Sequence, residues 1–159
     1  TDEKFPFLLD CATSTTQRGK IEVYAKLGKK MPKGWVINDA GEARTDSRAV
    51  LNELVAGTAA LVPLGGIGEE MSGYKGYGYS TVVEILSAAL QQGAYMKMLL
   101  GIKDGKKVPY HLGHFFLAIN IEAFTTLRSF KKIAGDILRE LRASKKMPGA
   151  KRIFTAGEK

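Results

Sequence analysis

The sequence predicts a single domain in which one β-sheet is layered with α-helices. The length of 159 residues suits one domain with a sizeable core. Short apolar runs of strand length alternate with segments whose apolar residues recur at helical spacing, which is typical of a sheet covered by helices. No internal repeat, linker or low-complexity tract interrupts this alternation.

The first half of the chain is predicted to hold three strands and two helices. Residues 5–13 (FPFLLDCAT) form an apolar run broken by one acid, which is typical of a buried strand. Residues 14–32 follow as a helix, because hydroxyl residues suited to capping open the segment and a glycine and a proline close it. Residues 34–38 and 59–65 are predicted strands, and between them Asp46 caps a short helix with an apolar face.

The second half is predicted to hold two longer helices. The first runs from about residue 75 to residue 92. Residues 94–113 are predicted as a loop or short helical piece with an Asp-Gly turn, and residues 114–120 (HFFLAIN) as a strand. Residues 122–147 hold an amphipathic helix, and residues 151–157 form a last strand or an extended tail. The apolar stripe of the amphipathic helix consists of Phe124, Leu127, Phe130, Ala134, Ile137 and Leu141.

The glycine-rich stretch at residues 64–80 (LGGIGEEMSGYKGYGYS) has two possible roles. Free N–H groups and the positive end of the dipole at the start of a helix suit a phosphate, and Lys75 adds a positive charge there. Alternatively, the glycines only allow the backbone to cross closely. Tyr77 and Tyr79 are expected to pack, and the adjacent acids Glu69 and Glu70 to be solvated.

A second candidate feature is Asp10, an acid at the end of a predicted strand. Its carboxylate could accept a hydrogen bond from a ribose hydroxyl, or it could cap the helix that follows.

Several common functional motifs are absent from the sequence. The glycine run lacks the third glycine of GxGxxG and the GK[ST] ending of the Walker motif, and there is no GxSxG elbow. Two histidines and one cysteine do not make a zinc ligand set, so no metal is expected.

The net charge of +8 invites a nucleic-acid interpretation. The basic residues are spread along the chain and are not interleaved with aromatic residues, so nucleic acid is not the expected partner. A positive field that attracts small anions explains the charge at least as well.

Cellular context is indicated by composition. One cysteine and five methionines suit a reducing, cytoplasmic compartment. The first residues are acidic and polar, unlike a secretory signal, and no apolar run approaches the roughly 18 residues of a membrane span. We therefore expect a cytoplasmic protein without a membrane partner.

Five segments resemble, in colinear order, the malate/L-lactate dehydrogenase family that does not use the Rossmann fold, whose relatives include sulfolactate, ureidoglycolate and diketogulonate oxidoreductases. The segments are LLDCATSTTQRGKI, MPKGWVINDAGEARTD, LVPLGGIGEEMSGYKGYGYSTVVEILSAAL, GHFFLAINIEAF and FTAGE. The resemblance implies an α+β fold with a mixed, largely antiparallel sheet and helices packed on it, in a non-Rossmann NAD(P)-binding domain. It also implies a homodimer and a parent protein roughly twice as long, of which residues 1–159 are the cofactor-binding domain.

The resemblance also implies site residues. Its catalytic histidine, in a Ser-His motif, would lie outside this chain, because neither His111 nor His114 stands in that context. Lys20 occupies a position where imine reductases of the family carry an aspartate, which favours a hydroxy-acid enzyme. Arg18 and Gly19 match positions that touch substrate or cofactor in some members. The cofactor-binding positions that match are Asp10, Cys11, Ala12, Lys75, Gly76, Gly157 and Glu158.

The sequence thus predicts an oxidoreductase that uses NAD or NADP, with NAD favoured, to interconvert a small 2-hydroxy acid and its 2-oxo acid. The alternative is a stand-alone module that binds a dinucleotide or anion without catalysis. A basic nucleic-acid-binding domain is a third possibility.

Overall fold

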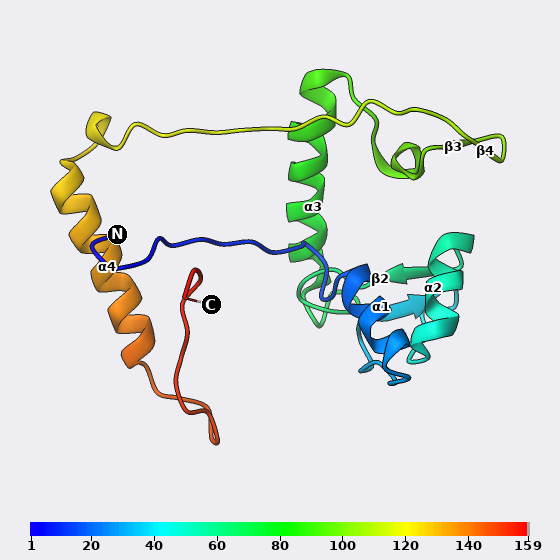
Figure 1. The fold of residues 1–159 in the computed structure, drawn as a ribbon, viewed down its shortest axis with the longest axis horizontal. Coiled ribbons are helices and arrows are strands. Elements are labelled where there is room, and N and C mark those ends of the chain that lie inside the picture. Colours follow the sequence, from blue (N-terminus) through cyan, green and yellow to red (C-terminus); the bar gives the residue numbers. More distant parts are fainter. Residues whose placement is uncertain (159) are drawn as a thin grey trace. The chain divides into compact units, whose positions relative to one another are not determined.

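The computed structural model describes residues 1–158, which form two compact units. One unit consists of residues 12–115. The other joins residues 1–11 to the chain from residue 116 onward. Figure 1 shows the elements of both units. The prediction that residues 1–159 act as one cofactor-binding domain of a longer protein stays a prediction.

The core of the unit formed by residues 12–115 is a small α/β layer. It contains α1 (Arg18–Lys26), β1 (Val36–Asn38), α2 (Ser47–Ala56) and β2 (Ala59–Leu61). The two strands pair antiparallel, with Val36 opposite Leu61. Helix α2 packs on both α1 and β2. The buried side chains at the centre are Ile21, Met31, Val36 and Val50.

Local signals in the sequence explain how α2 begins and ends. The carboxylate of Asp46 accepts hydrogen bonds from the backbone N–H groups of Arg48 and Ala49, both at 3.0 Å. These bonds lower the pKa of Asp46, the one from Ala49 most. The helix ends at Gly57, whose φ of 75° is the left-handed conformation that glycine adopts most easily. The predicted cap at Asp46 is confirmed.

The rest of this unit holds α3 (Gly73–Ala88), the 3₁₀ turns η1 (Ala89–Gln91) and η2 (Met96–Leu100), and a short hairpin. The hairpin pairs β3 (Ile102–Lys103) with β4 (Lys106–Lys107), and both turn residues, Asp104 and Gly105, have positive φ. This is the conformation expected of an Asp-Gly hairpin turn. The predicted turn and the helix near residues 75–92 are both confirmed.

The second unit is built on α4 (Leu127–Ala143), preceded by η3 (Ile121–Ala123). The hydroxyl of Thr126 caps α4 by accepting a hydrogen bond from the Ser129 N–H at 3.2 Å. The N-terminal segment contacts α4, since the Asp2 N–H donates to the Lys131 carbonyl at 3.1 Å. The predicted amphipathic helix is confirmed, although much of its apolar stripe, including Ile137 and Leu141, is about half exposed in this chain.

The predicted α+β class with antiparallel pairing is confirmed, but the sheet is smaller than predicted. The described residues form two sheets of two strands each. Residues 5–13 and 114–120, predicted as strands, form no strand there, and Figure 1 draws them as plain trace. Residues 151–157 take the predicted alternative of a tail. A strand needs a partner for its N–H and C=O groups, and apolar composition alone does not supply one. Phe116 is accordingly 88% exposed.

We predict that replacing Asp46 with alanine lowers the midpoint of thermal unfolding by about 5 °C, because two N–H groups at the start of α2 lose their acceptor. Asp46→Asn should retain most of the stability, because asparagine also caps helices well. Circular dichroism measures the midpoints. Asp39→Ala, which removes an exposed acid from a turn, is the control. Equal midpoints for Asp46→Ala and Asp39→Ala would contradict the role given to the cap.

Candidate functional site

The predicted site residues divide between the two units. Asp10, Cys11, Gly157 and Glu158 belong to the unit built on α4, whereas Ala12, Lys75 and Gly76 belong to the unit of residues 12–115, with Arg18 and Gly19. Each group is therefore described within its own unit.

The chain after Ala12 pairs with the strand that leads into the glycine-rich loop. The Thr15 N–H donates to the Val62 carbonyl at 2.7 Å, and the Leu64 N–H donates to the Thr13 carbonyl at 2.9 Å. Thr15 adds a bond from its hydroxyl to the Pro63 carbonyl at 3.0 Å. Two segments with predicted site residues, about 50 positions apart in sequence, are thereby brought side by side at the base of the loop.

The glycines of the loop allow it to fold tightly against the start of α3. A Cβ added to Gly65 would lie 2.1 Å from the Ser72 carbonyl oxygen, and one added to Gly76 would lie 2.2 Å from the Leu64 nitrogen. A Cβ on Gly73 would lie 2.3 Å from the Gly66 carbonyl oxygen. Close backbone packing, the second of the two roles considered for these glycines, therefore accounts for these three positions.

The N–H groups at the start of α3 are largely engaged within the loop. Gly73 donates to the Gly68 carbonyl at 3.0 Å, Lys75 to the Ser72 carbonyl at 3.1 Å and Gly76 to the Leu64 carbonyl at 2.9 Å. The assumption that these amides are free to hold a phosphate is wrong, because the loop carbonyls reach them first. The side chain of Lys75 is exposed, with its Nζ 6.0 Å from the centre of the Tyr74 ring. The charge of Lys75 thus remains available for an anion.

A hollow of about 440 Å³ lies beside the loop. Its volume falls in the range of small-molecule pockets, roughly 300–1,000 Å³. Among its described lining residues Glu69 alone is charged. The residues that line it are Ile37, Val62, Pro63, Gly66, Ile67, Gly68, Glu69, Gly73, Tyr74 and Tyr77.

The tyrosines of α3 differ from the sequence-based expectation. Tyr77 and Tyr79 were expected to pack, but their side chains are 70% and 66% exposed in this chain. The reason is that α3 makes extended contact with η1 and with no other helix or strand among the described residues. Tyr77, with Tyr74, instead forms an aromatic wall of the hollow.

The first turn of α1 carries the two residues matched to a substrate or cofactor contact. Arg18 pairs with Glu22 along the helix at 3.2 Å, and Gly19 has open space around it. Just before the helix, the Thr16 hydroxyl is buried without a hydrogen-bond partner among the described residues. Lys20 lies over the Trp35 ring, with its Nζ 4.8 Å from the ring centre. Arg18 and Gly19 therefore stay predictions.

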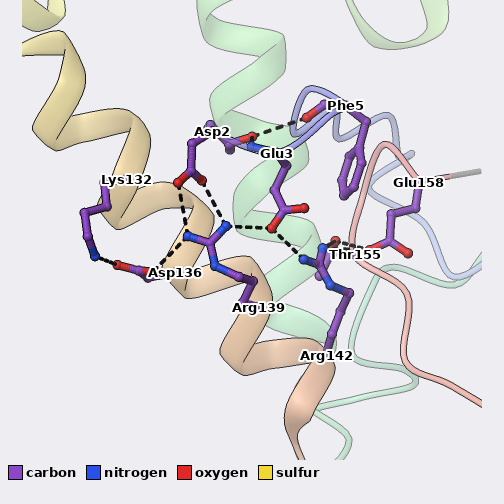
Figure 2. A network of polar contacts seen from close by, with 10 residues as sticks. Asp2, Glu3, Phe5, Lys132, Asp136, Arg139, Arg142, Thr155 and Glu158 are labelled. Carbon is purple, nitrogen blue, oxygen red and sulfur yellow. Dashed lines mark hydrogen bonds and ion pairs between the residues drawn. The ribbon is translucent and has the colours of Figure 1, made fainter.

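In the other unit, the carboxylate of Glu158 is held by three donors. It accepts a hydrogen bond from the Thr155 hydroxyl at 2.7 Å and one from Arg142 at 2.9 Å, and it pairs with Arg152. Figure 2 shows Thr155 and Arg142 beside Glu158. The Thr155 bond is the main cause that lowers the pKa of Glu158 to about 2, and Arg142 lowers it further. Sequence reasoning missed both partners, since no local pattern links a helix residue to a turn 13 to 16 positions later.

Gly157 lies against the N-terminal segment. Its φ is 99°, and a Cβ there would lie 2.1 Å from the Pro6 carbonyl oxygen. The Leu8 N–H also donates to the Ala156 carbonyl at 3.3 Å. Asp10 and Cys11, two and three residues beyond Leu8, are exposed. Two sequence segments with predicted cofactor residues thus meet in this unit.

The family model for malate/L-lactate dehydrogenase matches residues 1–159, the whole chain. This chain belongs to that family. The predicted resemblance is therefore confirmed. The match includes the glycine-rich loop and the Gly157–Glu158 turn.

Relatives of this family member are similar over nearly its full length. It is 43% identical over 154 residues to the malate dehydrogenase of Pyrococcus abyssi, which covers 97% of this chain and 40% of that protein. It is 30% identical over 146 residues to the Δ1-pyrroline-2-carboxylate reductase of Ancylobacter novellus. The chain therefore spans about 40% of the length of these relatives.

Solved structures of related proteins have the same fold. The malate dehydrogenase of Entamoeba histolytica matches with a TM-score of 0.90 and 42% identity, over 99% of this chain and 44% of that one. The sulfolactate dehydrogenase of Methanocaldococcus jannaschii matches with a TM-score of 0.70 and 28% identity, over 96% of this chain and 40% of that one.

Two further searches of the described residues bear on function. Residues 1–158 contain no group of three or more His, Cys, Asp or Glu side chains that could hold a metal ion. Within the same residues, no helix combines the length and apolar character needed to cross a membrane.

We predict opposite effects for two glycines of α3. Gly76→Ala should destabilise the protein by about 2 kcal/mol, because the new methyl group meets the Leu64 backbone. Gly78→Ala should stabilise it by about 0.5–1 kcal/mol, because the position is helical and has open space. Urea unfolding followed by fluorescence of Trp35, in the same unit, measures both changes. Similar stabilities for the two variants would contradict the close packing described for the loop.

We predict that Glu158 makes the stability of its unit depend on acid. Its folded pKa of about 2 lies below the ordinary 4.5, so its stabilising contribution is complete above about pH 5 and is lost as the pH falls toward 2. The thermal midpoint of Glu158→Gln, measured by circular dichroism, should lie below that of the wild type at neutral pH. The two midpoints should converge as the pH approaches 2, and a constant difference across this range would show that Glu158 is not the group responsible.

Proposed function

We propose that the protein is an NAD(P)-dependent oxidoreductase that interconverts a small 2-hydroxy acid and its 2-oxo acid, with NAD the favoured cofactor. In this proposal the present chain supplies the cofactor-binding part. The observation that carries the proposal is the family match over residues 1–159. The malate dehydrogenase of Pyrococcus abyssi, 43% identical, is a relative whose name states this class of reaction.

The unit of residues 12–115 has features that suit part of a dinucleotide. The hollow beside the glycine-rich loop is largely apolar, and Tyr74 and Tyr77 give it the flat aromatic walls that suit a planar ring. We assign to Lys75, whose ammonium group is exposed nearby on α3, the role of balancing the charge of a phosphate. Gly76 would serve by keeping the loop close to the helix.

In the unit built on α4, the exposed carboxylate of Asp10 suits a ribose hydroxyl as a hydrogen-bond acceptor. Cys11 and Ala12 continue the same segment. When bound, the nicotinamide would donate a hydride to the C2 carbon of the acid or accept one from it. The residues of this chain would contribute by binding the cofactor and fixing its orientation, which makes the transfer effectively intramolecular.

The proton that accompanies this transfer would be handled outside the present chain, by the histidine that the resemblance implies. His111 and His114 do not stand in the Ser-His context of that residue. The backbone of His111 is part of the fold, since its carbonyl accepts a hydrogen bond from the Ala94 N–H at 2.6 Å. We therefore assign neither of them the role of acid or base.

The whole protein is proposed to be longer than this chain, cytoplasmic and a homodimer. The chain spans about 40% of the length of its relatives. Large apolar side chains on α3 and α4, such as Val82, Val83, Ile133 and Ile137, are also more than half exposed. Other parts of the protein or a second subunit would cover such surfaces.

We predict that the protein binds NADH or NADPH with micromolar affinity, and that Lys75→Ala weakens binding at least about fivefold by removing a phosphate contact. Isothermal titration calorimetry measures both affinities and shows which nucleotide is preferred. Lys26→Ala, which removes an exposed lysine at the end of α1, is the matched control and should leave the affinity unchanged.

The outcomes separate the proposal from its alternative. Binding together with reduction of small 2-oxo acids by the full-length protein supports the proposed enzyme. Binding without turnover of any 2-oxo acid favours a stand-alone dinucleotide-binding module. Absence of binding to both nucleotides would refute the cofactor site, and equal weakening by Lys75→Ala and Lys26→Ala would reduce the role of Lys75 to general charge.

A further inference from the structure

One arginine of α4 connects three separate parts of the unit built on that helix. Arg142 donates hydrogen bonds to Glu3 at 2.7 Å, to Glu158 at 2.9 Å and to the Thr155 hydroxyl at 3.3 Å. Figure 2 shows it between the N-terminal segment and the C-terminal turn. Its guanidinium also lies 5.6 Å from the centre of the Phe5 ring. Arg142 therefore contacts both segments that carry the predicted cofactor residues of this unit.

The carboxylate of Glu158 is already used within the protein. One oxygen accepts from Thr155 and Arg142, the other pairs with Arg152, and the side chain is only 5% exposed. A direct bond from this carboxylate to a cofactor would compete with three existing donors, two of them charged. The position of Glu158 thus fits a group that fixes the turn better than a group that touches the ligand.

The turn held by Glu158 is coupled to the N-terminal segment through the backbone. Gly157 approaches Pro6 so closely that no side chain fits there, and Leu8 donates to the Ala156 carbonyl at 3.3 Å. A shift of the turn would therefore displace the chain that continues from Leu8 to Asp10.

We propose that Arg142 is a positioning residue for the cofactor, which acts through Glu158 and Glu3. It holds the turn at residues 155–158 and the N-terminal segment in the register in which the Gly157 backbone and the Asp10 carboxylate meet the dinucleotide. Glu158 contributes by accepting from Arg142 and not by touching the cofactor. The cofactor part of this inference rests on the proposed function, whereas the ordering of the turn does not.

Arg139, one turn earlier on the same helix, provides a matched control. It forms ion pairs with Asp2, Glu3 and Asp136, at distances of 2.8–3.0 Å, but has no contact with the turn at residues 155–158. Replacing Arg139 removes as many ion pairs from α4 as replacing Arg142, so the two variants differ in whether the C-terminal turn loses its anchor.

The test compares Arg142→Met, Arg142→Lys and Arg139→Met with the wild type in the full-length protein. Hydrogen exchange, measured by mass spectrometry without nucleotide, follows peptides that cover residues 153–158 and 5–11. Affinity for NADH and NADPH and the kcat and KM values of 2-oxo acid reduction follow the cofactor. We expect Arg142→Met to speed exchange in both peptides and to raise the cofactor KM about tenfold with a smaller change in kcat. Arg142→Lys should recover part of both effects, and Arg139→Met should change neither the two exchange rates nor the KM by more than about twofold.

A double-mutant cycle decides whether Glu158 acts through Arg142. If it does, Glu158→Gln combined with Arg142→Met should weaken cofactor binding no more than the stronger single variant. Additive losses would show that Glu158 contacts the cofactor by itself and would overturn the proposal, as would unchanged exchange at residues 153–158 in Arg142→Met. A wild type that binds neither nucleotide would instead refute the proposed function, and the exchange measurement would still decide whether Arg142 orders the turn.

Discussion

The contact between the backbones of Gly76 and Leu64 is the constraint on which the candidate site depends. Gly76 donates to the Leu64 carbonyl at 2.9 Å, at a distance that leaves no room for a Cβ. Leu64 in turn donates to Thr13. The chain after Ala12, the strand before the loop and the start of α3 are thus joined in one continuous set of backbone hydrogen bonds. The hollow lined by Tyr74 and Tyr77 and the exposed Lys75 take their places from this set.

The sequence predicted the features that local chemistry determines. Asp46 caps α2 through N–H groups two and three residues away, and the Asp104–Gly105 turn needs only its own two residues to adopt positive φ. It did not predict features that depend on distant partners. Residues 114–120 have the composition of a strand but no neighbouring strand among the described residues, and the amides of α3 are engaged by carbonyls whose positions depend on the loop conformation. Glu3 and Arg142, 139 positions apart, could not be paired by any local pattern.

The two units present different kinds of chemistry. The unit of residues 12–115 offers an apolar hollow with aromatic walls and a lysine, while the unit built on α4 offers a network of ion pairs around the turn at residues 155–158. Such a network is worth little as a source of stability where it is exposed to solvent. Its value here lies in geometry, because Arg142 and the buried Glu158 fix the course of two segments that otherwise have no helix or strand to hold them.

The central claim is that the start of α3 and the adjacent hollow bind a nicotinamide dinucleotide. A crystal structure of the full-length protein with NADH or NADPH tests it most directly. The account predicts a planar ring of the cofactor in the hollow between Tyr74 and Tyr77, with a phosphate oxygen within hydrogen-bonding distance of the Lys75 ammonium. A cofactor bound elsewhere, with the hollow empty and Lys75 in contact with solvent alone, would contradict it.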